Sequence, residues 1–163
     1  MKEIWELVDC RGVPSGVLYD RGAGGAIDKE NYFKVVEVFV KVGDRVLVTR
    51  RHKSKWCGLL WEAPGGGVIG KESDRAAAVR ELFEETGITS SEDELIYLGR
   101  YLQHPAMVES FLLVLDRVPT IRLQESESID YRFVKKDKLL EMRRILTGST
   151  YERVLEYQDK IFN

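Results

Sequence analysis

Apolar and polar residues alternate in several short segments of the chain, a pattern typical of half-buried β-strands. Such segments occur at residues 4–9, at 17–20 after a turn, and at 32–42. Residues 45–51 follow the third segment across Gly43-Asp44, a pair that favours a tight turn, so residues 32–51 are expected to form a hairpin. Further strands are expected at residues 95–103, 108–115 and 129–134.

The chain also contains signals for three helices. Ser73 is placed to cap a helix over residues 73–86, and Gly87 stands where a helix end favours a left-handed residue. Two helices are expected near the end of the printed sequence, the first capped by Asp137 and the second by a capping box of Ser149 and Glu152. The segments between elements, including the glycine-rich residues 65–67, are expected to be loops. Strands, a helix, more strands and then helices predict an α/β fold in which a mixed sheet packs between helices.

The helix over residues 73–86 is amphipathic in an unusual way. Its polar face is acidic, because Glu81, Glu84 and Glu85 are three and four residues apart. The opposite face is expected to pack on the sheet through apolar residues: Ala76, Val79, Leu82 and Phe83.

Composition places the chain among ordinary folded proteins. It has 163 residues, of which 44% are hydrophobic and 32% charged, and its formal net charge is -2. One domain with one core is therefore expected, with no nucleic-acid polymer as a partner. Neither an apolar run long enough to span a membrane nor a signal-peptide pattern occurs, and the two cysteines, Cys10 and Cys57, form no metal-binding motif. These features favour a cytoplasmic protein with reduced thiols and no membrane association.

The acidic helix face has an ordinary interpretation, that of a solvated surface, and a chemical one. Three carboxylates at these spacings repel one another, and a bound hard cation such as Mg²⁺ or Mn²⁺ would remove that repulsion. Two neighbouring features favour the cation. Glycines 65–67 allow backbone to approach a ligand closely, and Arg80 can hold Glu81 and Glu84 in a fixed geometry by forked hydrogen bonds.

Residues 66–88 resemble the sequence box of the Nudix hydrolases. Every fixed position of that box is occupied with the correct spacing: Gly66, Glu72, Arg80, Glu81, Leu82, Glu84, Glu85, Gly87 and Ile88. The preceding "LLWEAPGGG" and the later "ESIDYRFVKKDKLL" are similar to the family's flanking segments. The resemblance implies an α/β/α sandwich with a mixed β-sheet, here as one domain over residues 1–163 with an N-terminal β extension at about 1–31.

The resemblance also implies an activity and roles for the box residues. Most Nudix hydrolases use a divalent metal, Mg²⁺ or Mn²⁺, to cleave a diphosphate linkage in a nucleoside diphosphate joined to another group, a small-molecule substrate. Glu81, Glu84 and Glu85 match the metal-binding positions, and Glu72 matches the acid that supports the metal site. Arg80 matches the orienting arginine of the catalytic machinery, to which we also assign Glu84. The backbone of Gly66 is expected to lie beside the substrate and metal.

For residues outside the box, no fixed motif assigns a role, and several candidates are considered. The family often brings one further glutamate to the site from a later segment, and we favour Glu127, with Glu125 next and Glu109 as the alternative from a strand. Arg50 and Arg51 are candidates for contacts with substrate phosphates, although an exposed basic loop is the simpler interpretation. Residues Trp56 and Trp61 could stack on a base or serve in packing.

Two other functions remain open from the sequence. The N-terminal segment is similar to that of the Nudix subgroup containing isopentenyl diphosphate isomerases, although Cys57 lies before the glycine loop rather than within it. A regulatory module that binds a nucleotide without catalysis is the second alternative, and the complete set of box acids argues against it. A homodimer is an oligomeric state that the sequence leaves open.

Overall fold

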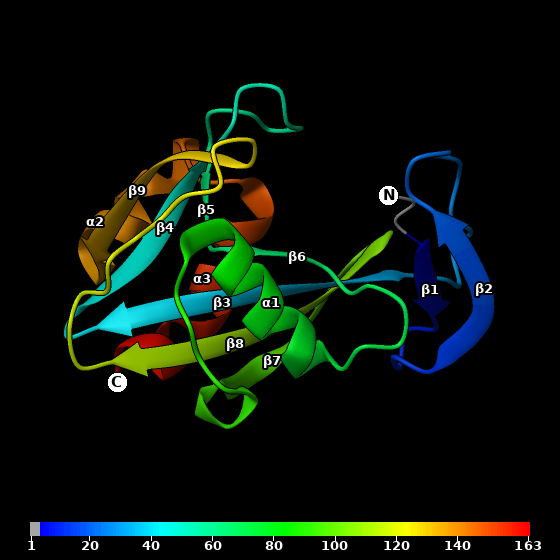
Figure 1. Cartoon of the computed structure of the whole chain (residues 1–163), viewed down its shortest axis with the longest axis horizontal. Coiled ribbons are helices and arrows are strands. Elements are labelled where there is room, and N and C mark those ends of the chain that lie inside the picture. Colours follow the sequence, from blue (N-terminus) through cyan, green and yellow to red (C-terminus); the bar gives the residue numbers. More distant parts are fainter. Residues whose placement is uncertain (1–3) are drawn as a thin grey trace.

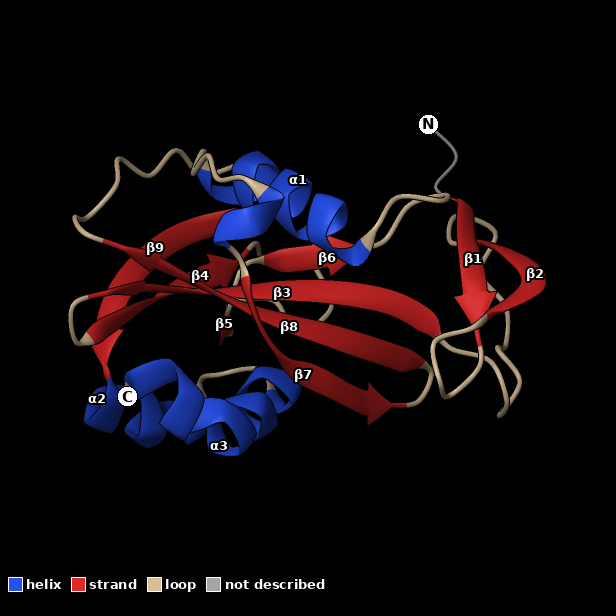
Figure 2. Cartoon of the chain, turned by 90° about the horizontal axis from the view of Figure 1, so that it is seen from below, coloured by secondary structure: helices blue, strands red, loops and turns tan. Residues whose placement is uncertain are grey.

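The computed structural model describes residues 4–163. A mixed sheet lies between helix α1 on one face and helices α2 and α3 on the other, and a small two-stranded sheet projects from one end (Figures 1 and 2). The strands are β1 (Ile4–Val8), β2 (Pro14–Asp20), β3 (Phe33–Val42), β4 (Arg45–Arg51), β5 (Trp61–Glu62), β6 (Gly65–Gly67), β7 (Ile96–Gln103), β8 (Ala106–Leu115) and β9 (Ser128–Lys135). The helices are α1 (Asp74–Thr86), α2 (Lys136–Glu141) and α3 (Gly148–Phe162), with short 3-10 turns at Glu92–Glu94 and Met142–Arg144. The predicted α/β/α sandwich is confirmed.

Strand β3 organises the sheet because it changes partners along its length. It pairs in parallel with β8 throughout, from Phe33 opposite Ala106 to Val42 opposite Leu115, which makes the sheet mixed. On its other side, residues 35–37 pair with β6, whereas β4 pairs only at residues 41–42. The predicted hairpin at Gly43-Asp44 is therefore present, but β3 and β4 diverge beyond the turn. The divergence leaves space at the end of the sheet where β5 and β6 lie.

Alternating side chains of β3 enter two separate cores. Val36, Val38 and Val40 pack beneath α1 against Ala77, Ala78 and Leu82. Phe39 points to the other face and packs with residues of β4 and α3, among them Val46, Val48, Val154, Tyr157 and Ile161. This period-two alternation on a strand buried on both faces explains why one helix lies above the sheet and two below it.

Helix α1 has the predicted ends and a different buried face. Ser73 accepts a hydrogen bond from the backbone N–H of Ala76 at 3.0 Å, and Gly87 has a φ of 73°, so both caps are confirmed. Phe83, however, is 54% exposed, and the prediction that it packs on the sheet is wrong. The buried stripe passes through Ala78, Leu82 and Glu85, spaced four and three residues apart. One carboxylate of the acidic cluster thus lies on the side facing the sheet.

Two further local predictions are wrong. Asp137 does not cap α2, since Lys135 occupies the cap position and Asp137 lies in the first turn. Ser149 and Glu152 do not form a capping box on α3 either, because Thr147 caps that helix and accepts a hydrogen bond from the N–H of Thr150 at 3.3 Å. The N–H of Thr147 donates to Trp61 O at 2.8 Å and is satisfied outside the helix, and α3 begins two residues earlier than the sequence pattern suggested.

The N-terminal hairpin β1–β2 is attached to the main sheet by specific contacts. Trp5 stacks near Phe33, with ring centroids 4.7 Å apart, and Arg100 Nη1 donates to the carbonyl of Arg11 at 2.5 Å. The predicted extension at about 1–31 includes residues 1–3, which lie outside the described residues. Among residues 4–163, none of the helices is both long and apolar enough to cross a membrane.

The buried face of α1 gives a matched pair of substitutions. Replacing the fully buried Leu82 by Ala should lower the free energy of unfolding by about 2–5 kcal/mol, because it leaves a cavity beneath the helix. Replacing the exposed Phe83 by Ala should change it by about 0.5 kcal/mol or less. Urea unfolding followed by circular dichroism measures both values. Equal losses for the two variants would contradict the assigned orientation of the helix.

Candidate active site

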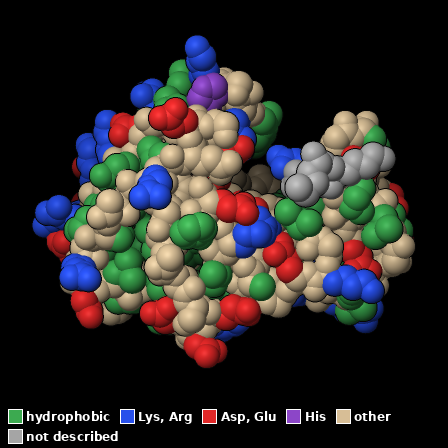
Figure 3. Space-filling model, viewed as in Figure 1, with side chains coloured by type: hydrophobic (Ala, Val, Ile, Leu, Met, Phe, Trp, Pro, Cys, Tyr) green, Lys and Arg blue, Asp and Glu red, His purple; other side chains and the backbone are tan. Residues whose placement is uncertain are grey.

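A cavity of about 1020 Å³ opens where β3 and β4 diverge. Its walls come from several parts of the chain: the N-terminal hairpin, β3, β5 with the loop after β4, the box strand and helix, the turn between β7 and β8, the segment before β9, and the start of α3. In the space-filling view the surface is hollowed between the N-terminal hairpin and the loop after β4 (Figure 3). The volume is at the upper end of the range of about 300–1,000 Å³ for small-molecule sites.

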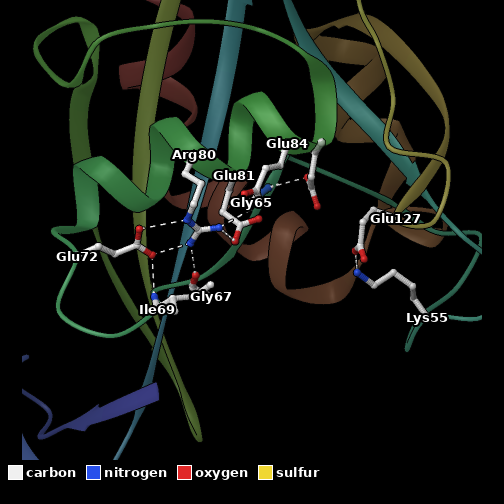
Figure 4. Close-up of polar contacts among 10 residues, drawn as sticks. Lys55, Gly65, Gly67, Ile69, Glu72, Arg80, Glu81, Glu84 and Glu127 are labelled. Atoms are coloured by element: carbon white, nitrogen blue, oxygen red, sulfur yellow. Dashed lines mark hydrogen bonds and ion pairs between the residues drawn. The ribbon is translucent and has the colours of Figure 1, made fainter. Parts of the chain in front are cut away.

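Arg80 lies at the centre of a hydrogen-bond network within the box (Figure 4). Its Nη2 donates to Glu72 Oε1 at 2.6 Å and to the carbonyl of Gly67 at 2.9 Å, and its Nε donates to Glu72 Oε2 at 3.1 Å. Its Nη1 donates to Glu81 Oε1 at 2.6 Å and to Glu84 Oε2 at 3.2 Å. One guanidinium thus joins strand β6, the following loop and helix α1.

The opposite charges in this network shift the pKa values of Arg80 and Glu72 so that both stay ionised. The hydrogen bonds that Arg80 donates to Glu72 and Glu81 raise the pKa of Arg80 despite its partial burial. Burial alone would raise the pKa of Glu72, but the hydrogen bonds from Arg80 and from the N–H of Ile69 lower it overall. Glu72 is therefore ionised at neutral pH, where it holds the loop and the arginine in place.

Glu85 is in a very different environment. It is only 5% exposed, and its Oε2 accepts a hydrogen bond from the N–H of Gly65 at 3.0 Å. Burial, together with the negative charge of Glu62, raises the pKa of Glu85 to about 8. Burial also raises the pKa of Glu62, although Arg51 Nη1 donates to its two oxygens at 2.5 and 2.6 Å. The carboxyl groups of Glu85 and Glu62 thus interact with each other, and Arg51 is the arginine that bonds to Glu62.

Gly65, Gly66 and Gly67, at the start of the box, form strand β6 rather than the predicted loop, and each is needed for a different close approach. A side chain at Gly65 would collide with the carbonyl of Val36, and one at Gly66 would collide with the Glu81 carboxylate. A Cβ at Gly67 would lie 2.8 Å from the indole of Trp5. The absence of side chains here lets β3, the box helix and the N-terminal hairpin meet at one wall of the cavity.

The donor types at this wall fit a hard divalent cation. Glu81, Glu84 and Glu85 all line the cavity and offer carboxylate oxygens, the ligands that Mg²⁺ and Mn²⁺ prefer. Within residues 4–163, no three such side chains already converge as a coordination group. Arg80 engages Glu81 and Glu84, and the side chain of Glu84 is 48% exposed. The residues present therefore suit a cation whose binding rearranges the carboxylates.

The residues proposed outside the box separate into two groups. Glu127 and Arg51 line the cavity, and Glu127 forms an ion pair with Lys55 (Figure 4). Arg50 does not line it and instead donates from Nε to the carbonyl of Leu59 at 3.0 Å. Neither Glu125 nor Glu109 lines it.

Glu109 is instead part of a buried contact between strands. Its carboxylate accepts a hydrogen bond from Tyr97 and another from Arg100 Nε, each at 2.7 Å. The two tryptophans also differ: Trp56 is 81% exposed at the rim of the cavity, whereas Trp61 belongs to the core beneath it.

Several cavity residues were missed from the sequence. Glu62 and Lys55 lie outside the box, and the signal available for Glu62 was an acid enclosed between Trp61 and Ala63 in an apolar segment. The buried ion pair of Glu37 and Arg153 joins residues 116 positions apart, so no local pattern could reveal it. Trp5 from the N-terminal hairpin also lines the cavity.

The fold and this wall define a protein of the Nudix class, an α/β/α sandwich whose box helix and glycine strand form one side of a ligand cavity. A family model described as "NUDIX domain" matches residues 32–154. The chain therefore belongs to the Nudix hydrolase family, whose members hydrolyse the pyrophosphate bond of nucleoside diphosphate derivatives. The match begins directly after the N-terminal hairpin and its loop.

Solved structures share the fold at low sequence identity. DR0079 from Deinococcus radiodurans is 19% identical with a TM-score of 0.80, covering 95% of this chain and 99% of that one. A bifunctional NMN adenylyltransferase/ADP ribose pyrophosphatase from Francisella tularensis, complexed with AMP and a Mn ion, is 22% identical with a TM-score of 0.68 over 79% of this chain and 42% of that longer chain. An Ap4A hydrolase from C. elegans is 16% identical with a TM-score of 0.62 over 77% and 96% of the two chains. A comparison with curated proteins found no match.

The raised pKa of Glu85 predicts how stability depends on pH in metal-free protein. Between about pH 4.5 and about pH 8 the folded protein keeps the Glu85 proton while the unfolded chain loses it, so this group lowers stability as pH rises through that interval. Glu85→Gln removes this dependence. Unfolding free energies are measured with urea in the presence of a chelator. From pH 5 to pH 8 the unfolding free energy of the wild type should fall relative to that of the variant. A difference that is constant or moves the other way would contradict the assigned environment.

Proposed function

We propose that this protein is a Mg²⁺- or Mn²⁺-dependent hydrolase that cleaves the diphosphate linkage of a nucleoside diphosphate joined to another group. One observation carries the proposal: Glu81, Glu84 and Glu85, from consecutive turns of α1, all line one cavity large enough for such a ligand. We further propose a cytoplasmic enzyme, active as a monomer or homodimer, in which residues 1–163 form one domain with the N-terminal hairpin as its extension.

The cation would be held by Glu81, Glu84 and Glu85, with Glu72 supporting the site through Arg80. When bound, it would neutralise the diphosphate charge, orient the substrate and acidify a water molecule. Arg80 keeps its bonds to Glu72 and Gly67, so the loop stays fixed while Glu84 turns inward. The backbone of Gly66, which carries no side chain, allows the substrate phosphates to approach the wall.

Hydrolysis then consists of attack by the oxygen of water on phosphorus and cleavage of the bridging P–O bond. Each product keeps one of the two phosphates. We assign acceptance of the water proton to Glu127, a step typically worth about 10²–10⁴-fold in rate. Its ion pair with Lys55 holds the Glu127 carboxylate at the cavity, and Arg51 also lines the cavity, where it can contact phosphate oxygens.

The residues that line the cavity give little support to the alternative function, that of an isopentenyl diphosphate isomerase. Cys57 does not line the cavity, and no other cysteine is close in sequence to the box. Isopentenyl diphosphate nevertheless belongs in the first set of test compounds. The solved neighbours named for ADP-ribose and Ap4A motivate the others: ADP-ribose, nucleotide sugars, dinucleoside polyphosphates and nucleoside triphosphates.

The first test combines this panel with substitutions on α1. Glu84→Gln and Glu85→Gln should each lower Mg²⁺-dependent turnover by about 10²-fold or more, because each removes a charged ligand. Phe83→Ala is the matched control on the same helix and should retain activity. Turnover is measured by product formation with each compound at fixed Mg²⁺. Undiminished hydrolysis by both Gln variants would reject the assigned metal site.

A second test separates the two loop acids. Glu127→Gln should lower the maximal rate by about 10²-fold or more with little change in KM, since it removes the proposed base. Glu125→Gln is the control two residues away, exposed and outside the cavity, and should behave as wild type. Equal effects of both substitutions would exclude the proposed role.

A further inference from the structure

The first turn of helix α3 faces the cavity on the side opposite the box helix. Residues 147–150 line the cavity, and the helix they begin has 15 residues. Within residues 4–163, the N–H of Thr150 bonds to Thr147 Oγ and that of Tyr151 to Thr147 O, whereas no acceptor is found for the N–H groups of Gly148 and Ser149. An added Cβ at Gly148 would meet nothing within 4 Å, so the space before it is open. Free N–H groups at a helix start favour an anion.

Arg153 provides an independent sign of a ligand at the same place. The residue is 5% exposed and lines the cavity. Its Nε and Nη2 donate to the two oxygens of the buried Glu37, the second at 2.6 Å, and Ser110 Oγ also donates to Glu37 at 2.7 Å. Its Nη1 is buried and has no hydrogen-bond partner. An unpaired buried donor of a charged group is costly, and an anionic ligand would satisfy it.

Helix geometry brings these donors together. Arg153 is four residues after Ser149 and three after Thr150, so its side chain shares their face of α3. Helical side chains also lean toward the N-terminus, which directs the guanidinium toward the first turn. Two backbone N–H groups and one buried guanidinium nitrogen, all without a hydrogen-bond partner among residues 4–163, thus lie near the start of α3 beside the cavity.

The cavity consequently has two chemically different ends. The box helix supplies the carboxylates of Glu81, Glu84 and Glu85, which repel a phosphate unless a cation is bound. The α3 end supplies donors, and its acid, Glu37, is already fully engaged by Arg153 and Ser110. An anionic group can therefore bind at the α3 end without a metal.

We propose that the N-terminus of α3 and Arg153 Nη1 form a subsite for a phosphate monoester of the substrate, separate from the diphosphate that is cleaved. The assignment to substrate rests on the proposed function, whereas the binding of phosphate does not. The preferred substrates are then nucleotide derivatives that carry an additional phosphate on the part of the molecule remote from the scissile bond. Free inorganic phosphate shares this chemistry and is the other source to be distinguished.

Binding is tested first without metal or turnover. Inorganic phosphate is titrated into the chelator-treated protein, and the backbone amide resonance of Gly148 is followed by NMR. Wild type and Ser149→Asn should show the same saturable shift. Ser149→Asp should weaken the apparent affinity about tenfold or more, because it places a negative charge among the donors, while its unfolding temperature stays equal or rises through the helix dipole. No saturable shift of Gly148 in the wild type, or equal affinity in all three proteins, would overturn the subsite.

The substrate assignment is tested with a matched pair, ADP-ribose and its 2′-phosphate, at saturating Mg²⁺. Wild type and Ser149→Asn should have a KM at least about fivefold lower for the phosphorylated compound, and in Ser149→Asp the KM values of the two compounds should become equal. Equal KM values in the wild type would overturn the substrate assignment and leave the subsite to free phosphate. Failure of the wild type to hydrolyse any diphosphate compound would refute the proposed function, while the metal-free titration still decides the subsite.

Discussion

The guanidinium of Arg80 is the interaction on which the site depends. It bonds at once to the Glu72 carboxylate, the Gly67 carbonyl and the Glu81 carboxylate, which belong to three consecutive pieces of the chain. Without these hydrogen bonds from Arg80, the carboxylates on α1 and in the preceding loop would repel one another, and the loop would have no fixed position relative to the helix. Bidentate contacts of this kind fix orientation as well as charge, which a lysine could not reproduce.

A second constraint comes from the sheet. Strand β3 pairs with β4 only at residues 41–42 and with β6 at residues 35–37. The sheet therefore opens at one end, and chain segments from both of its faces reach the opening. The box helix arrives from one face and the start of α3 from the other. The glycines of β6 make this possible, since Gly65 and Gly66 leave no room for side chains against β3 and Glu81. The cavity is thus a consequence of strand pairing rather than of a flexible loop.

The carboxyl groups of the site differ because their surroundings differ. Glu72 is paired with an arginine and a backbone N–H, which lowers its pKa, whereas Glu85 is buried beside Glu62, which raises the pKa of Glu85 to about 8. The box motif gives Glu72 a supporting role and Glu85 a metal-binding role, but it does not predict their protonation states. Burial and neighbouring charges, which depend on the packing of α1 against β5 and β6, decide which acid is ionised in the absence of metal.

The sequence by itself determined the fold class, the limits of α1 and the family, because strand alternation, helix caps and the box are local patterns read within a few residues. Of the residues proposed outside the box, Glu127 and Arg51 line the cavity and Arg50 does not, and their roles stay predictions. Only the tertiary structure decided which face of α1 is buried, since Leu82 and Phe83 are equally apolar and differ only in what lies opposite them. The pairing of Glu37 with Arg153 likewise depends on the approach of α3 to β3, and contacts between residues distant in sequence leave no trace in a local pattern.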